Sequence, residues 1–318
     1  MDLNGLYVPL ITPFTASGEL ASGALEGLAH QVLGDGAAGL VALGTTGEPA
    51  TLTEAERHRV LDICSGVCRE RSATLIAGAG SNDTAASARD LAGLSAWPEV
   101  SAALTVVPYY TRPSEAGVVA HFTALAAESP VPLVIYNIPQ RTGQAVGWRA
   151  LQRLAALPNV AGMKQAVGGI DADTVRLMAG LPEGFAVLGG DDMFASSLLA
   201  LGASGAIMAS AHVCTSAFAV MIAAWRAGQA GPARELGHRL TGLAAALFAE
   251  PNPTVIKGVL CSMGRIPSAA VRLPLLAASA ASVAAAQEAL AGFESAGISA
   301  GISAQTPGAD VSQADAAA

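Results

Sequence analysis

The sequence predicts an α/β fold, a (β/α)8 TIM barrel with a C-terminal helical extension. Short apolar segments alternate with helical ones at a spacing of about 25 to 30 residues, the pattern of a parallel α/β fold. The strand segments are almost wholly apolar, as expected for strands buried on both faces. Eight such strand–helix units fit within about the first 230 residues, which favours a closed barrel.

Eight strands are expected, at Tyr7–Ile11, Gly39–Leu43, Thr74–Ala77, Ala102–Val106, Leu133–Tyr136, Val160–Met163, Ala186–Leu188 and Gly205–Met208. Helices are expected after the first seven, at Gly23–Leu33, Glu54–Cys68, Thr84–Leu94, Glu115–Ala127, Gly147–Ala156, Ala172–Met178 and Asp192–Leu201. Later helices are expected at Ser216–Ala227, Pro232–Ala249, Pro253–Met263 and in an alanine-rich segment ending near Leu290. A doubly wound sheet is the alternative, but no Gly-x-Gly-x-x-Gly turn follows the first strand.

These segments divide the chain into three parts. Residues 1–230 are predicted to form the barrel and carry the active site, and residues 231–292 the C-terminal helices. Residues 293–318 are mostly alanine, serine and glycine, so we predict a disordered low-complexity tail there.

Composition narrows the class of protein. Hydrophobic residues make up 52% of the chain and charged residues only 13%, which favours an oligomer with buried subunit contacts. The net charge of −8, without a basic stripe, argues against a nucleic-acid partner. No segment predicts a membrane span or a signal peptide, so a cytoplasmic protein is expected. Four cysteines without a Cys-x-x-Cys pair, and scattered histidines, predict no metal site.

Lysine is rare in this chain, which has two lysines and fifteen arginines. One of them, Lys164, ends the apolar run Asn159–Lys164, at the inner end of an expected strand. A guanidinium cannot act as an amine nucleophile, whereas a desolvated lysine can condense with a carbonyl. The alternative is a lysine that caps the strand and reaches water. Lys257 lies near an expected helix start and is interpreted as a surface residue.

Further polar residues follow other expected strands, at the end of a barrel where active sites lie. They include Thr45 and Thr46 in Gly44–Glu48, and three of the four tyrosines: Tyr109, Tyr110 and Tyr136. A tyrosine hydroxyl bonded to a threonine and a second tyrosine could relay the protons that imine formation requires. The two threonines could bind a small carboxylate, or Gly44–Glu48 could be a plain turn before a helix with a Thr53/Glu56 capping box.

Two more groups at this end of the barrel have open interpretations. Arg141 could bind a second carboxylate in bidentate fashion, or be a solvated loop charge. Asp191 and Asp192 fit helix N-terminal capping better than acid–base work. Glycines at 189 and 190 would leave room for a substrate.

Several ordered motifs resemble the dihydrodipicolinate synthase (4-hydroxy-tetrahydrodipicolinate synthase) family of the class I pyruvate aldolase superfamily, which includes N-acetylneuraminate lyase. They are Thr12-Pro13, Gly44-Thr-Thr-Gly-Glu48, Pro108-Tyr-Tyr-x-Arg-Pro113, Tyr136-Asn-x-Pro-x-Arg-Thr-Gly143, Gly162-x-Lys164, Gly190-Asp-Asp192 and Glu250-Pro-Asn-Pro253. The match runs from about residue 5 to residue 290. The resemblance implies condensation of pyruvate with aspartate 4-semialdehyde in lysine and diaminopimelate biosynthesis. It implies no cofactor, only a covalent imine.

The resemblance also implies roles for individual residues. Lys164 would form the imine with pyruvate, and Tyr136, Thr45 and Tyr110 would relay protons, with Tyr110 reaching a neighbouring subunit's site. Thr45 and Thr46 would bind the pyruvate carboxylate. Arg141 would bind the semialdehyde carboxylate, and Gly190 and Ile207 would shape the pocket. A shared Tyr110 implies at least a dimer, and in this family usually a homotetramer built as a dimer of dimers.

The chain departs from the family pattern in places. Gln165 stands where synthases usually have glutamate, and Pro49 where serine is common; either is compatible with a sister aldolase. Ala86 occupies the position of a carboxylate that grips lysine in lysine-inhibited members, and Glu54 and Arg57 replace frequent histidines, whereas Asn82 is retained. Lysine is therefore expected to inhibit weakly or not at all.

Three other functions remain open at this stage. The first is a related lyase acting on N-acetylneuraminate or a keto-deoxy sugar acid. The second is a non-catalytic barrel that binds a keto acid. The third is a phosphate-binding barrel using Gly202-Ala-Ser-Gly205, which reads more simply as the turn into the eighth strand.

Overall fold

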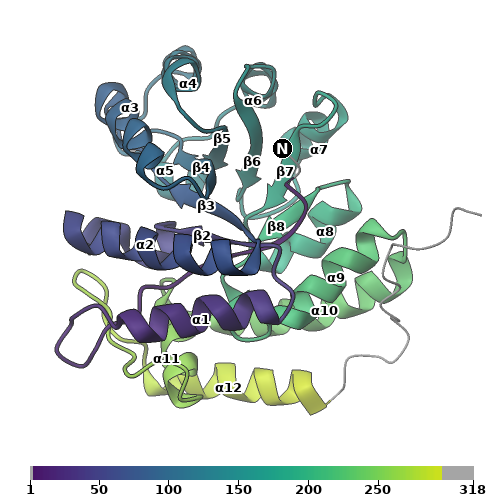
Figure 1. The fold of residues 1–318 in the computed structure, drawn as a ribbon. Coiled ribbons are helices and arrows are strands. Elements are labelled where there is room, and N and C mark those ends of the chain that lie inside the picture. The colour runs from purple at the N-terminus through teal and green to yellow at the C-terminus, as the bar shows by residue number, and fades with distance from the viewer. Residues whose placement is uncertain (1–2, 296–318) are drawn as a thin grey trace, which may run out of the picture.

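The computed structural model describes residues 3–295. Its eight strands form one closed barrel, in which each strand is parallel to the next and β8 closes on β1 (Figure 1). The predicted TIM barrel is confirmed, and the doubly wound sheet is excluded. The strands are β1 (Gly5–Pro9), β2 (Gly39–Ala42), β3 (Thr74–Gly78), β4 (Val100–Val106), β5 (Leu133–Asn137), β6 (Val160–Gln165), β7 (Ala186–Gly189) and β8 (Gly205–Ile207).

The helices lie outside the barrel (Figure 1). They are α1 (Ser22–Gly34), α2 (Glu54–Arg71), α3 (Thr84–Gly93), α4 (Glu115–Glu128), α5 (Pro139–Thr142), α6 (Trp148–Ala155), α7 (Ala172–Ala179), α8 (Ala195–Ala200), α9 (Thr215–Arg226), α10 (Ala230–Leu247), α11 (Thr254–Ser262) and α12 (Ala280–Ser295). Short 3-10 turns are η1 (Thr45–Gly47), η2 (Pro49–Thr51), η3 (Leu94–Ala96), η4 (Asp192–Phe194) and η5 (Ser210–His212). The expected helix at Asp192–Leu201 is therefore divided into η4 and α8.

The first strand differs most from its prediction. It begins at Gly5, which pairs with Gly205 of β8, and it ends at Pro9 rather than Ile11. Ile11 lies beyond the sheet because its N–H donates to Nε2 of the buried His212, at 3.1 Å, and not to a neighbouring strand. The predicted capping box at α2 is confirmed, with reciprocal bonds between Thr53 and Glu56.

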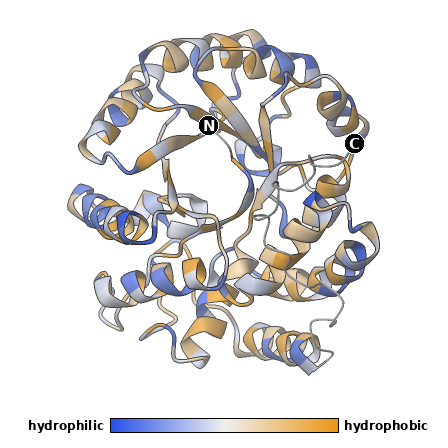
Figure 2. Cartoon of the chain, turned by 45° about the vertical axis from the view of Figure 1, so that its right-hand side comes forward, coloured by the Kyte–Doolittle hydropathy of each residue, from blue (hydrophilic) through white to orange (hydrophobic). Residues whose placement is uncertain are grey.

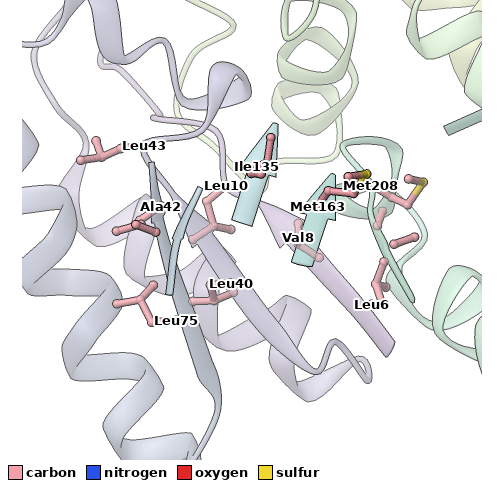
Figure 3. Close-up of a cluster of buried hydrophobic side chains, with 14 of the residues drawn as sticks. Leu6, Val8, Leu10, Leu40, Ala42, Leu43, Leu75, Ile135, Met163 and Met208 are labelled. Atoms are coloured by element: carbon pink, nitrogen blue, oxygen red, sulfur yellow. The ribbon is translucent and has the colours of Figure 1, made fainter. Parts of the chain in front are cut away.

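Apolar side chains fill both sides of the barrel wall, because alternate strand residues point in and out. The outward ones pack against the helices, as Figure 3 shows for Leu40, Ala42, Leu75, Ile135 and Met163. Figure 2 shows hydrophobic residues along the strands and hydrophilic ones on the outer helices. The inward-facing cluster includes Tyr7, Val41, Ile76, Val134, Tyr136, Leu188 and Ile207.

The C-terminal helices form their own apolar cluster on the α1 side of the barrel (Figure 1). There α12 packs against α10 and α11. The predicted start of the tail at residue 293 is wrong, because Phe293 is buried in α12 and its ring lies 4.8 Å from the Arg239 guanidinium carbon. The rest of the predicted tail, residues 296–318, lies outside the described residues. Within residues 3–295, no helix is long and apolar enough to cross a membrane.

Candidate active site

Lys164 lies on the inner face of β6, inside the barrel. It is 6% exposed, so it does not reach water as a strand cap. Its register partner on β5 is Tyr136, and its Nζ lies 4.4 Å from the centroid of the Tyr136 ring. The inward-facing apolar cluster, which includes Leu188 and Ile207, lines the same interior. A rare amine is thus held among hydrocarbon side chains beside a phenol.

Gly190 gives the Lys164 side chain its space. A Cβ added at Gly190 would lie 2.9 Å from both Cγ and Cε of Lys164 and 2.8 Å from Cβ of Ala166. The Ala166 methyl and the Lys164 Cγ lie next to the backbone and cannot move aside as a flexible chain end would. Any side chain at position 190 therefore displaces the lysine.

We expect Gly190→Ala to lower kcat/KM by about 10²-fold, the size of effect that follows when a reacting group is displaced by about 1 Å. Gly169→Ala is the matched control, because an added Cβ there meets nothing within 4 Å. Steady-state kinetics of both variants give the comparison. Equal activities would show that the space around Lys164 does not depend on Gly190.

The interpretation of Asp191 and Asp192 as helix caps is wrong. Neither side chain caps η4 or α8. Asp191 Oδ2 accepts from the N–H of Gly168 at 2.6 Å, and Asp192 Oδ2 accepts from the N–H of Ser210 at 2.6 Å. The two carboxylates therefore tie together the loops after β6, β7 and β8. Burial raises the pKa of Asp192 to about 6.

Thr45 and Thr46 form the η1 turn directly after β2. Thr46 is buried, and its hydroxyl oxygen accepts from Nδ2 of Asn252 at 2.9 Å. Thr12 also stabilises this turn, because its hydroxyl donates to the Gly47 carbonyl at 2.7 Å. Within residues 3–295, the Thr46 hydroxyl accepts the bond from Asn252 and donates to no other group, so its O–H could donate to a ligand.

Tyr110 and Arg141 are not brought to Lys164 within one chain. Tyr110 is 88% exposed and has a left-handed φ of 62°, at the tip of the loop after β4. Asn82 holds this loop, because its Oδ1 accepts from the Tyr109 N–H at 2.8 Å. Arg141 lies exposed on α5, the short helix after β5. Among the described residues, no hydrogen bond joins the Tyr136 hydroxyl to Thr45.

Gln165 does not face the Lys164 amine, because neighbouring strand residues point to opposite faces. It is buried on the outer face of β6, where its Oε1 accepts from Asn137 at 2.9 Å and its Nε2 lies 3.4 Å from the Thr174 hydroxyl. The residue that departs from the family pattern therefore joins β6 to β5 and α7.

The interpretation of Lys257 as a surface residue is also wrong. Its side chain is fully buried, and Nζ donates to Oε1 of Glu48 at 2.5 Å. Burial lowers the pKa of Lys257, while the Glu48 carboxylate acts in the opposite direction. The rarity of lysine singled out Lys164 and applies equally to Lys257. The residues that surround Lys257, however, are too distant in sequence for a local pattern to reveal.

The chain combines a closed parallel barrel with a buried lysine on β6, beside a tyrosine of β5. These features place it in the class of (β/α)8 enzymes that carry a lysine on a barrel strand. Within that class, the chain belongs to the Dihydrodipicolinate synthetase family, whose model matches residues 2–291.

Individual members of the family are similar over nearly their whole length. The chain is 40% identical over 273 residues to the 4-hydroxy-tetrahydrodipicolinate synthase of Syntrophus aciditrophicus. The alignment covers 85% of this chain and 91% of that protein. The synthase structure from Methylacidiphilum fumariolicum SolV has a TM-score of 0.87 at 30% identity, covering 92% of this chain and 96% of that one. The chloride-inhibited Acinetobacter baumannii enzyme, complexed with pyruvate, has a TM-score of 0.87 at 32% identity, covering 92% and 99%.

Proposed function

We propose that the chain condenses pyruvate with aspartate 4-semialdehyde to 4-hydroxy-tetrahydrodipicolinate, a step of lysine and diaminopimelate biosynthesis. The observation that carries this proposal is the buried Lys164 amine 4.4 Å from the Tyr136 ring centroid. Its family membership supports the same reaction. The enzyme is a Schiff-base-forming lyase.

The chemistry needs no group beyond the chain and its substrates. The Lys164 amine adds to the ketone carbon of pyruvate, and the ketone oxygen leaves as water when the imine forms. Loss of a methyl proton gives an enamine, whose carbon attacks the aldehyde carbon of the semialdehyde. The semialdehyde's amine then displaces Lys164 as the ring closes, which frees the enzyme. Each step moves protons, for which Tyr136, Thr45 and Tyr110 form the proposed relay.

The remaining site residues are proposed to bind the substrate carboxylates and to line the pocket. Thr45 and Thr46 would hold the pyruvate carboxylate through their hydroxyl and backbone N–H groups. Gly190 and Ile207 would form the walls of this pocket. Arg141, exposed on α5, is free to meet the carboxylate of the semialdehyde at the mouth of the barrel.

The second substrate is the part of this proposal that most needs a test. Two activities are compared: coupled turnover of pyruvate with aspartate semialdehyde, and cleavage of N-acetylneuraminate and keto-deoxy sugar acids. The comparison distinguishes the synthase from a sugar-acid lyase. Activity with the semialdehyde is expected. Activity on sugar acids alone would replace the synthase assignment with a sister lyase. A barrel that binds pyruvate and turns over neither substrate would be the non-catalytic alternative.

The working unit is proposed to be a homotetramer built as a dimer of dimers, in which Tyr110 completes a neighbouring site. The 88% exposure of Tyr110 supports this proposal, because the ring is not packed against its own chain. The four free cysteines are compatible with a reducing cytoplasm, where we place the enzyme.

Mixing two inactive variants tests the shared site. In a mixed dimer of Lys164→Arg and Tyr110→Phe chains, one site has both its lysine and the partner's tyrosine. Activity above the sum of the separate variants is therefore expected after they are dissociated and reassembled together. If each chain uses its own Tyr110, the mixture gains nothing.

Lysine is proposed to inhibit weakly or not at all. Ala86 offers no carboxylate, and the nearby Asp83 carboxylate already accepts from the N–H groups of Ala85 and Ala86 as the cap of α3. An inhibition curve at subsaturating pyruvate is the measurement. Half-maximal inhibition at sub-millimolar lysine would contradict this expectation.

A further inference from the structure

Three residues of the C-terminal segment contact the turn that follows β2. Asn252 bonds to Thr46, Lys257 to Glu48, and Arg272 to both Glu48 and Thr51, in every case across more than 200 residues of sequence. No strand of the barrel contributes these three residues. Helix α11 and the loops on either side of it are therefore joined directly to the turn that carries Thr45 and Thr46.

Glu48 is the centre of this connection. It has a left-handed backbone, with φ of 52° and ψ of 40°, between η1 and η2. A non-glycine residue in that region persists only where its surroundings hold it there. Its Oε1 accepts from Lys257 Nζ, and its Oε2 accepts from the backbone N–H of Arg272 at 3.0 Å. Both carboxylate oxygens of Glu48 therefore accept hydrogen bonds from the C-terminal segment.

Lys257 is itself held from several sides. Beside its bond to Glu48, its Nζ donates to the Ala270 carbonyl at 3.0 Å and lies 4.1 Å from the centroid of the Phe14 ring. The side chains of Lys257 and Glu48 are 0% and 2% exposed. A buried charge pair of this kind is geometrically demanding, because either partner alone would be an uncompensated charge.

Arg272 extends the connection across the turn. Its Nη1 donates to the Thr51 carbonyl at 2.8 Å, and its Nη2 to the Gly18 carbonyl at 2.8 Å. It also binds both carboxylate oxygens of Glu56, and this hydrogen bonding lowers the pKa of Glu56 to about 2. The guanidinium thus joins the turn to the start of α2 and to the loop before α1.

We propose that Lys257, Arg272 and Asn252 are positioning residues for the Thr45–Thr46 turn and thereby set the affinity for the keto-acid carboxylate. Lys257 and Arg272 fix the turn through Glu48, and Asn252 through Thr46. This inference rests on the proposed function, because it takes that turn as the carboxylate site. None of the three touches the reacting atoms. They act through the backbone N–H groups and the Thr46 hydroxyl, whose direction depends on where the turn is held.

The test compares variants that break this connection with one that disturbs the same segment elsewhere. Glu48→Gln/Lys257→Met removes both charges together, so no buried charge is left alone. Asn252→Ala removes only the bond to Thr46. Arg239→Met is the matched control, since Arg239 joins α10 to the Phe293 carbonyl on α12, remote from the turn.

The readouts are KM for pyruvate, kcat at saturating pyruvate, and borohydride trapping of the pyruvate imine. The double variant is expected to raise KM by about tenfold, with kcat within about threefold of the unaltered chain, and Asn252→Ala to raise KM by about threefold. Arg239→Met should lower the thermal midpoint and leave KM unchanged. Such a split between KM and kcat does not follow from a general loss of stability.

Two results would overturn the inference. One is a KM within twofold of the unaltered value in the double variant or, should that variant not fold, in Asn252→Ala. The other is a KM increase of equal size in Arg239→Met. Failure of the proposed function would look different, because the unaltered chain would then either trap no pyruvate or trap pyruvate without turning over aspartate semialdehyde.

Discussion

Replacing Lys164 by arginine is expected to lower kcat by at least about 10³-fold, because the guanidinium keeps charge and length but forms no imine. Lys164→Met should behave in the same way with an uncharged side chain of similar volume. The measurement is the coupled turnover assay, with circular dichroism as a check on the fold. Among the described residues, no ion pair within 4.0 Å involves Lys164. Burial raises the pKa of the Asp191 and Asp192 carboxylates, however, and the positive charge of Lys164 acts in the opposite direction, to lower it. Arginine keeps that charge and methionine removes it.

The two variants together separate chemistry from electrostatics. If Lys164 supplied only a positive charge for binding anionic substrates, arginine would retain much of the activity and methionine would not. Equal and large losses are expected if the amine is the nucleophile. Substantial turnover by Lys164→Arg would be incompatible with imine formation at this residue.

Replacing Lys257 by methionine is expected to lower the free energy of unfolding by about 3 to 5 kcal/mol, because Glu48 would remain buried without its partner charge. The pair is almost wholly inaccessible to water, with side chains 0% and 2% exposed. Urea denaturation at fixed protein concentration gives the measurement, from the midpoint at unchanged slope.

The double change Glu48→Gln/Lys257→Met distinguishes the charge pair from simple packing. It is expected to recover most of the lost stability, because replacing both members of a buried pair is often close to neutral. If the single and double variants unfold at the same urea concentration, the loss comes from packing around Phe14 and Ala270. A stable single variant would show that Glu48 is accommodated without Lys257.

Much of the fold was predictable because its signals are local. Apolar runs buried on both faces, separated by helices with identifiable caps such as Thr53 and Glu56, define a parallel barrel with little ambiguity. The errors occur where the end of an element depends on a hydrogen bond to a residue distant in sequence. Ile11 leaves β1 because its N–H bonds to His212, which is 201 residues away in sequence.

The residues of the candidate site also fall into those that the sequence could pair and those that it could not. Lys164 and Tyr136 could be paired from sequence, since each lies close to the end of its strand and parallel neighbours bring those ends together. The roles of Asp191 and Asp192 could not, because the N–H groups that donate to their carboxylates belong to loops after other strands. Glu48 was visible as part of a motif, but the lysine that neutralises it is 209 residues further along. Tyr110 is 88% exposed in the single chain, and its proposed contact with a neighbouring subunit involves a second chain.

Borohydride reduction in the presence of pyruvate, followed by peptide mapping, tests the central claim most directly. The chain has only two lysines, so the modified residue is identified without ambiguity. One reduced pyruvate on Lys164, and none on Lys257, is the expected result. A modified Lys257, or a chain that reduction leaves unmodified, would contradict the assignment of Lys164 as the imine-forming residue.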